Sequence, residues 1–119
     1  MPELSTASSN SEIPAPVTPD TAFRVASLSK AFAGTLSALL VSEGAMNWDS
    51  PIVNQLPAFT LRDGAAAQKI TVRQVLSHQV GLAYNTYDRD LEANQPYPLL
   101  AAKLAEAPLT CSPGECYAY

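Results

Sequence analysis

A serine and a lysine three positions apart offer the most specific chemistry in this sequence. Ser27 and Lys30 form an S-x-x-K tetrapeptide at the start of an apolar segment, and this spacing places both residues on one helix face. A serine attacks a carbonyl only when a base takes its proton, and a lysine held neutral by burial can be that base. A helix amino terminus adds N–H groups that favour a developing oxyanion. On the tetrapeptide alone, a capping serine beside a solvated lysine stays open as the alternative.

Other arrangements that activate a serine lack their residues here. The sequence has no G-x-S-x-G, so it lacks the nucleophile motif of an α/β-hydrolase. A Ser-His-Asp triad would have to use His78, the single histidine, which lies shortly before Gly81 at the end of a predicted helix. We favour a structural, helix-capping role for His78 over a catalytic one. One histidine and two cysteines also argue against structural zinc, so no metal is expected.

Three helices are predicted to position these residues. Apolar side chains recur at helical spacing over residues 28–40, and Gly44 supplies a left-handed stop. A second helix is expected to start at the capping residue Thr71 and to end before Gly81. A third, rich in leucine and alanine, is predicted over residues 98–106. The predicted fold class is therefore mainly α.

The remaining segments are predicted to be short or irregular. A short helix is expected to open at residues 49–51 (Asp-Ser-Pro) and to close at Pro57. Residues 59–69 and 82–96 are predicted to be loops because they show no period. Residues 22–26 are the one candidate strand.

Length, charge and hydropathy limit the class of protein. The chain has 119 residues, 47% of them hydrophobic, which fits a single modest domain. Residues 1–20 hold four prolines and are predicted to form an extended arm before a partial domain over residues 21–119. A net charge of −4 does not favour binding to nucleic acid. No apolar run reaches the roughly 18 residues of a membrane span.

Three ordered segments resemble one enzyme family, the serine β-lactamase-related hydrolases. That group holds class C β-lactamases, penicillin-binding D-alanyl-D-alanine carboxypeptidases and β-lactamase-like carboxylesterases. Its nucleophile segment is similar to residues 21–52, TAFRVASLSKAFAGTLSALLVSEGAMNWDSPI. Its next helix and turn are similar to residues 70–82, ITVRQVLSHQVGL, and its approach to a second motif, Y-x-N, is similar to residues 113–119, PGECYAY.

The resemblance implies roles for three residues. Ser27 matches the nucleophile that forms an acyl-enzyme, and Lys30 matches the base beside it. Tyr119 matches the tyrosine of Y-x-N, which helps move protons to and from the serine and the leaving group. Tyr117 falls on the preceding aromatic position, where a packing role is expected. The implied fold is α+β, and this chain would supply mainly its helical lobe. No cofactor is implied.

The resemblance also implies segments that these residues do not contain. The asparagine of Y-x-N and the later K-T-G or H-x-G strand have no counterpart within residues 1–119. We therefore expect a truncated domain that is inactive alone and has the remainder of the domain as its partner. The implied substrate is a small acyl compound: a β-lactam, a D-alanyl peptide or an ester. The implied location is the periplasm or cell envelope, with the cytoplasm open because no signal peptide is visible.

A second hypothesis is a non-catalytic helical fragment or interaction module derived from such an enzyme. The missing motifs favour it. Met46, Trp48 and Val53 would then be exposed where the absent sheet packs, which favours association with other protein.

The two cysteines, Cys111 and Cys116, flank a Pro-Gly pair that favours a tight reversal of the chain. A disulfide is expected if the parent enzyme works in a periplasm, and two free thiols if it works in the cytoplasm. Both states stay open from the sequence.

Overall fold

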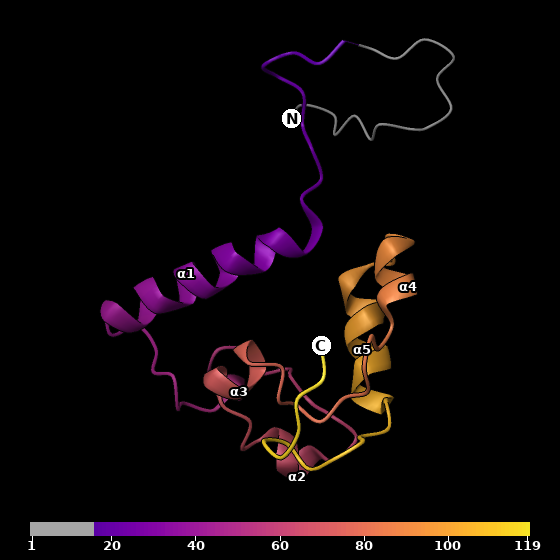
Figure 1. Ribbon diagram of the computed structural model, residues 1–119. Coiled ribbons are helices and arrows are strands. Elements are labelled where there is room, and N and C mark those ends of the chain that lie inside the picture. Colours follow the sequence, from indigo (N-terminus) through magenta and orange to yellow (C-terminus); the bar gives the residue numbers. More distant parts are fainter. Residues whose placement is uncertain (1–15) are drawn as a thin grey trace. The chain divides into compact units, whose positions relative to one another are not determined.

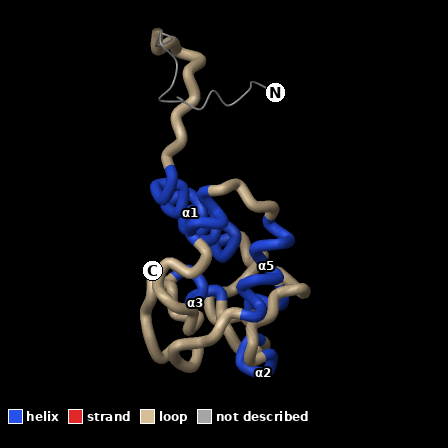
Figure 2. Tube along the Cα trace, turned by 90° about the vertical axis from the view of Figure 1, so that its right-hand side faces the viewer, coloured by secondary structure: helices blue, strands red, loops and turns tan. Residues whose placement is uncertain are grey.

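The computed structural model describes residues 16–119, and every regular element in this part of the chain is helical (Figures 1 and 2). Strand-type pairing there is limited to isolated bridges, between Pro51 and Thr71 and between Leu82 and Leu109. The predicted fold class, mainly α, is confirmed. The α-helices are α1 (Ser29–Ser42), α2 (Gly64–Ala67), α3 (Val72–Leu76), α4 (Asp88–Glu92) and α5 (Tyr97–Glu106).

The chain divides into two compact units, Met1–Ser37 and Ala38–Tyr119, with the boundary inside α1. Each unit is described by itself. Residues 1–15, most of the predicted arm, lie outside the described residues. Just after them the chain makes a turn in which the Thr21 amide donates to the Thr18 carbonyl at 3.0 Å. The division into an arm and a domain stays a prediction.

Helix α1 confirms the helix predicted from apolar spacing. A 3₁₀ turn, Ala26–Leu28, leads into it, and Gly44 follows its end with φ +74°. Glycine adopts this left-handed conformation without the steric cost that other residues meet. The apolar stripe is formed but remains largely exposed in the described chain, at 71%, 75% and 57% for Leu28, Phe32 and Leu36.

The candidate strand at residues 22–26 does not form. The backbone there is irregular, and Ala26 already belongs to the 3₁₀ turn before α1. A strand also needs a neighbour to pair with, and the described residues 16–119 contain no named strand.

The short helix predicted from residues 49–51 is shorter and begins differently. Only the 3₁₀ turn Ile52–Asn54 forms, and Pro51 is its N-cap residue rather than its first helical position. The Asp49 side chain does not cap this turn. It instead pairs with the Arg73 guanidinium, whose Nε lies 2.9 Å from Asp49 Oδ1. The hydrogen bond from Arg73 lowers the pKa of Asp49, and the same bond raises the pKa of Arg73.

Two helices form where loops were predicted. The Asp63 carboxylate caps α2 by accepting from the Ala66 amide at 2.9 Å. Helix α4 lies within the predicted loop of residues 82–96 and is tied to α5, because Lys103 Nζ donates to Asp90 Oδ2 at 2.7 Å. The same ammonium lies 4.7 Å from the ring centre of Tyr87. Helices of four or five residues are too short to show a periodic stripe.

The core of the second unit lies around the turns that flank α2 and α3. Main-chain bonds close it, since the Ile52 amide donates to the Ile70 carbonyl at 2.7 Å. Met46 and Trp48 pack against this core, and Val53 is half-buried, so the exposure that the second hypothesis gives these residues is wrong. The buried apolar side chains of the core are Ile52, Leu61, Ala67, Ile70 and Val72.

Helix α3 confirms the capping signal at Thr71. The Thr71 hydroxyl accepts from the Gln74 amide at 3.2 Å, and the Gln74 side chain accepts from the Thr71 amide at 3.0 Å. This reciprocal pair is a capping box. The helix ends at Leu76, and the chain then turns through two left-handed residues, His78 at φ +57° and Gly81 at φ +91°.

Replacing Gly81 by alanine is expected to destabilise the second unit strongly. Left-handed strain alone costs about 1–3 kcal/mol. A Cβ at Gly81 would in addition lie 2.5 Å from the Cys111 carbonyl oxygen. The matched control is Gly44→Ala, because Gly44 has φ +74° but nothing within 4 Å of its Cβ position. Urea unfolding should show a larger loss for Gly81→Ala, and equal losses in the two variants would contradict the close contact.

Candidate active site

The predicted serine and lysine lie together at the start of α1. Ser27 sits in the 3₁₀ turn, and Lys30 is the second residue of the helix. Lys30 Nζ donates to Ser27 Oγ at 3.2 Å. Both residues are exposed to solvent. The first turn of α1 contains no acidic side chain, so no carboxylate opposes the positive end of the helix dipole.

The residue before the serine has an unusual backbone. Ala26 has φ +46°, in the left-handed region that alanine rarely adopts. Its Cβ meets steric resistance there, at a cost of about 1–2 kcal/mol. Strained residues of this kind collect at functional sites, where the surrounding structure holds them. The strain at Ala26 therefore adds a second reason, besides the lysine contact, to regard Ser27 as a functional residue.

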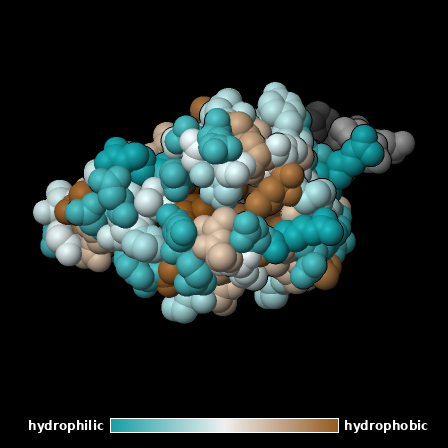
Figure 3. Space-filling model, turned by 90° about the horizontal axis from the view of Figure 1, so that it is seen from below, coloured by the Kyte–Doolittle hydropathy of each residue, from teal (hydrophilic) through white to brown (hydrophobic). Residues whose placement is uncertain are grey.

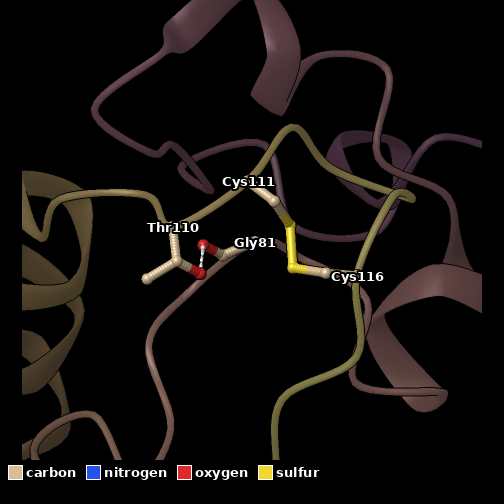
Figure 4. The surroundings of a disulfide bond; sticks show 4 residues. All are labelled: Gly81, Thr110, Cys111 and Cys116. Atoms are coloured by element: carbon tan, nitrogen blue, oxygen red, sulfur yellow. Dashed lines mark hydrogen bonds between the residues drawn. A yellow bond between two sulfur atoms is a disulfide. The ribbon is translucent and has the colours of Figure 1, made fainter.

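The segment that leads to Tyr119 is attached to the turn after α3. The Thr110 amide and hydroxyl both donate to the Gly81 carbonyl, at 2.8 Å and 3.2 Å. The Gly114 amide donates to the Gln79 carbonyl at 2.8 Å. Figure 4 shows that the Thr110 contact lies next to the disulfide. The turn therefore supplies carbonyl acceptors, at Gln79 and Gly81, to the C-terminal segment.

The disulfide left open by the sequence is present. Cys111 and Cys116 are bonded across the Pro-Gly turn, with their Cα atoms 6.3 Å apart (Figure 4). Gly114 adopts φ +90° in this turn, which glycine does without strain. The bond closes a small loop three residues before Tyr119.

Removing this disulfide is expected to lower stability modestly. The chain-entropy estimate for so short a loop is about 2 kcal/mol. Thermal unfolding of the Cys111→Ser, Cys116→Ser double variant should therefore show a lower midpoint than the wild-type protein. Thiol titration of denatured, unreduced protein should find no free thiol. Two free thiols in that titration would contradict the bond.

After the disulfide loop, main-chain hydrogen bonds and a ring contact with His78 fix the position of Tyr119. The Asn85 amide donates to the Tyr119 carbonyl at 3.3 Å, and the Ala118 amide donates to the His78 carbonyl at 3.0 Å. The His78 and Tyr119 rings meet edge to face, with centroids 4.8 Å apart. Tyr117 is 65% exposed, and its ring centre lies 6.0 Å from that of His78.

The predicted site residues therefore fall into two groups. Ser27 and Lys30 touch each other and belong to the first unit, whereas Tyr119 belongs to the second. The residue that sequence reasoning left out of the site is His78, which it treated as a helix cap. Its backbone does end the α3 segment in a left-handed conformation, as a cap does. Its ring contact with Tyr119 had no sequence signal, because the two residues are far apart along the chain.

Other kinds of site find little support among the described residues. Residues 16–119 contain no group of three or more His, Cys, Asp or Glu side chains placed to hold a metal ion. No helix in that range is both long and apolar enough to cross a membrane. An open groove in the second unit contains none of the predicted site residues, and is lined by Arg62, Asp63, Ala66, Leu109, Thr110, Cys111, Ser112 and Pro113.

Comparison with known proteins places the chain in a family. The model of the Beta-lactamase family matches residues 5–119. Penicillin-binding protein 4 of Amycolatopsis lactamdurans is 34% identical over 67 residues, which cover 56% of this chain and 18% of that protein. Esterase EstB of Burkholderia gladioli is 31% identical over 125 residues, which cover 87% of this chain and 30% of that protein. The chain thus spans less than a third of the length of these curated relatives. Because the family match covers nearly the whole sequence, the chain belongs to the beta-lactamase family.

Proposed function

We propose that this chain carries the nucleophile and much of the helical lobe of a serine hydrolase that works through an acyl-enzyme. Membership of the beta-lactamase family supports a hydrolase of this general kind. The observation that carries the proposal is the 3.2 Å contact from Lys30 Nζ to Ser27 Oγ at the entry to α1. A nucleophile within hydrogen-bond reach of its base is the arrangement that covalent catalysis needs.

The proposed reaction proceeds in two steps. Ser27 Oγ attacks the carbonyl carbon of a lactam, amide or ester while Lys30 Nζ accepts the hydroxyl proton. The proton passes to the leaving group, with the Tyr119 phenol helping to transfer it. Water then attacks the acyl-enzyme and restores the Ser27 hydroxyl. No step requires a cofactor.

This mechanism requires that further protein cover the start of α1. A lysine accepts a proton only in its neutral form, which burial favours. Lys30 is exposed in this chain, and the apolar side chains Leu28 and Phe32 beside it are 71% and 75% exposed. Covering this face would bury the apolar stripe and desolvate Lys30 together. We therefore propose that the 119-residue chain alone has no useful turnover.

The proposed substrates are small acyl compounds, namely β-lactams, D-alanyl peptides or esters. The names of the relatives support this range, since one is a penicillin-binding protein and one is an esterase. The test compares the full-length protein with the 119-residue chain on nitrocefin and on a fluorogenic ester. We expect the full-length protein, but not the 119-residue chain, to turn over at least one of the two compounds. Turnover of neither compound by the full-length protein would contradict the proposal, and equal turnover by the short chain would contradict the need for further protein.

A non-catalytic helical module is the second candidate, and the exposed apolar stripe of α1 favours it. Leu36 and Leu39 continue the stripe at 57% and 52% exposure, so the helix is suited to pack against other protein. On the face shown in Figure 3, hydrophobic residues form separate areas rather than one continuous patch. The same assay separates the candidates, because an interaction module would show no turnover in any length of protein.

A further inference from the structure

His78 occupies a backbone conformation that a smaller residue would fill with less strain. Its φ is +57°, in the left-handed region where asparagine and glycine are the common residues. Histidine is itself among the residues enriched in this region, together with asparagine and aspartate, so the backbone does not select for an aromatic ring. The backbone conformation alone therefore does not explain why an aromatic ring stands at this position.

The backbone of His78 connects α3 to the segment of Tyr119. Its amide donates to the Val75 carbonyl at 3.2 Å, within the last turn of α3. Its carbonyl accepts from the Ala118 amide at 3.0 Å. His78 is thus fixed to a capped helix on one side and to the neighbour of Tyr119 on the other. A ring attached to this point has a defined position relative to Tyr119.

The ring of His78 uses that position to contact Tyr119. The two ring centroids are 4.8 Å apart at an interplanar angle of 68°, an edge-to-face geometry that aromatic pairs prefer. Tyr119 is 41% exposed, so the contact with His78 restrains a ring that is only partly buried. His78 itself is half-buried. The contact with Tyr119 gives the His78 ring a role that its backbone conformation does not require.

We propose that His78 is a positioning residue for Tyr119, acting through its ring and not as an acid or base. This inference rests on the proposed function, in which the Tyr119 phenol helps transfer a proton. Proton transfer requires the phenol within hydrogen-bond reach of the reacting groups, and misplacement of a catalytic group by about 1 Å can cost up to about 10²-fold in rate. The His78 ring limits rotation of the tyrosine before substrate binds.

Two substitutions in the full-length protein separate the ring from the backbone. His78→Asn removes the ring but suits the left-handed backbone, whereas His78→Phe keeps a ring of similar size in a less favourable backbone. If the ring positions Tyr119, His78→Phe should be the less stable of the two variants but the more active one. His78→Phe should keep kcat within a few-fold of wild type, and His78→Asn should lower kcat by roughly 10-fold or more with little change in KM. Thermal midpoints should rank the variants in the opposite order.

A spectroscopic measurement tests the contact without using activity. A fluorine label, Tyr119→3-fluorotyrosine, should give a ring-shifted resonance in the wild-type and His78→Phe proteins, and a different shift in His78→Asn. Equal kcat values in the two variants, or an unchanged fluorine shift in His78→Asn, would overturn the positioning role. Absence of turnover in the wild-type protein would contradict the proposed function instead, and the fluorine shift would then decide whether the ring holds Tyr119.

Discussion

Replacing Ser27 by alanine in the full-length protein is expected to lower kcat by about 10⁶-fold, the size of effect seen when a serine nucleophile is removed. The reason is that the Ser27 hydroxyl lies 3.2 Å from Lys30 Nζ, within hydrogen-bond reach of the proposed base. KM should change little, because alanine leaves the surrounding surface intact. Steady-state hydrolysis of a fluorogenic ester measures both constants.

The matched control is Ser29→Ala. Ser29 is the first residue of α1, two positions after Ser27, and is likewise exposed. Its replacement should leave kcat near the wild-type value. A larger loss from Ser29→Ala than from Ser27→Ala would show that the nucleophile has been assigned to the wrong serine.

Replacing Lys30 by alanine is expected to slow acylation by about 10²- to 10⁴-fold, the usual contribution of a positioned general base. The acylation rate is measured from the burst phase with a slowly released ester. Lys30→Arg should be about as slow, because arginine keeps the charge but does not give up its proton in proteins. Lys69→Ala, at an exposed lysine of the second unit, is the control and should leave the rate unchanged.

The arginine variant decides what the lysine does. Acylation by Lys30→Arg at the wild-type rate would mean that the cation donates a hydrogen bond to Ser27 Oγ and takes no proton. An unchanged acylation rate in Lys30→Ala would show that Lys30 is a surface charge with no role in acylation.

Local signals in the sequence were sufficient for the elements that contacts within a few residues define. The apolar spacing that predicted α1 and the Thr71 capping signal of α3 both depend on neighbours three or four positions away. The contact between Ser27 and Lys30 is local in the same sense. Short helices such as α4 escaped prediction because tertiary ties, here the bond from Lys103 to Asp90, stabilise them.

Long-range features could not be derived in this way. The edge-to-face contact between His78 and Tyr119 depends on a turn after α3 and on a disulfide-closed loop that meet only in the folded chain. The apolar spacing of the sequence also failed to predict which side chains are buried. Trp48 packs against the core although the second hypothesis has it exposed, while the apolar stripe of α1 is exposed although its spacing is typical of a buried face.

The central claim is that Ser27 is the acylated residue, and peptide mapping after reaction with an acylating probe tests it most directly. The full-length protein is treated with a β-lactam or activated ester, digested, and analysed by tandem mass spectrometry. We predict a single adduct, on Ser27, which is lost in Ser27→Ala and formed more slowly in Lys30→Ala. An adduct on Ser29 or on any residue other than Ser27 would contradict the account.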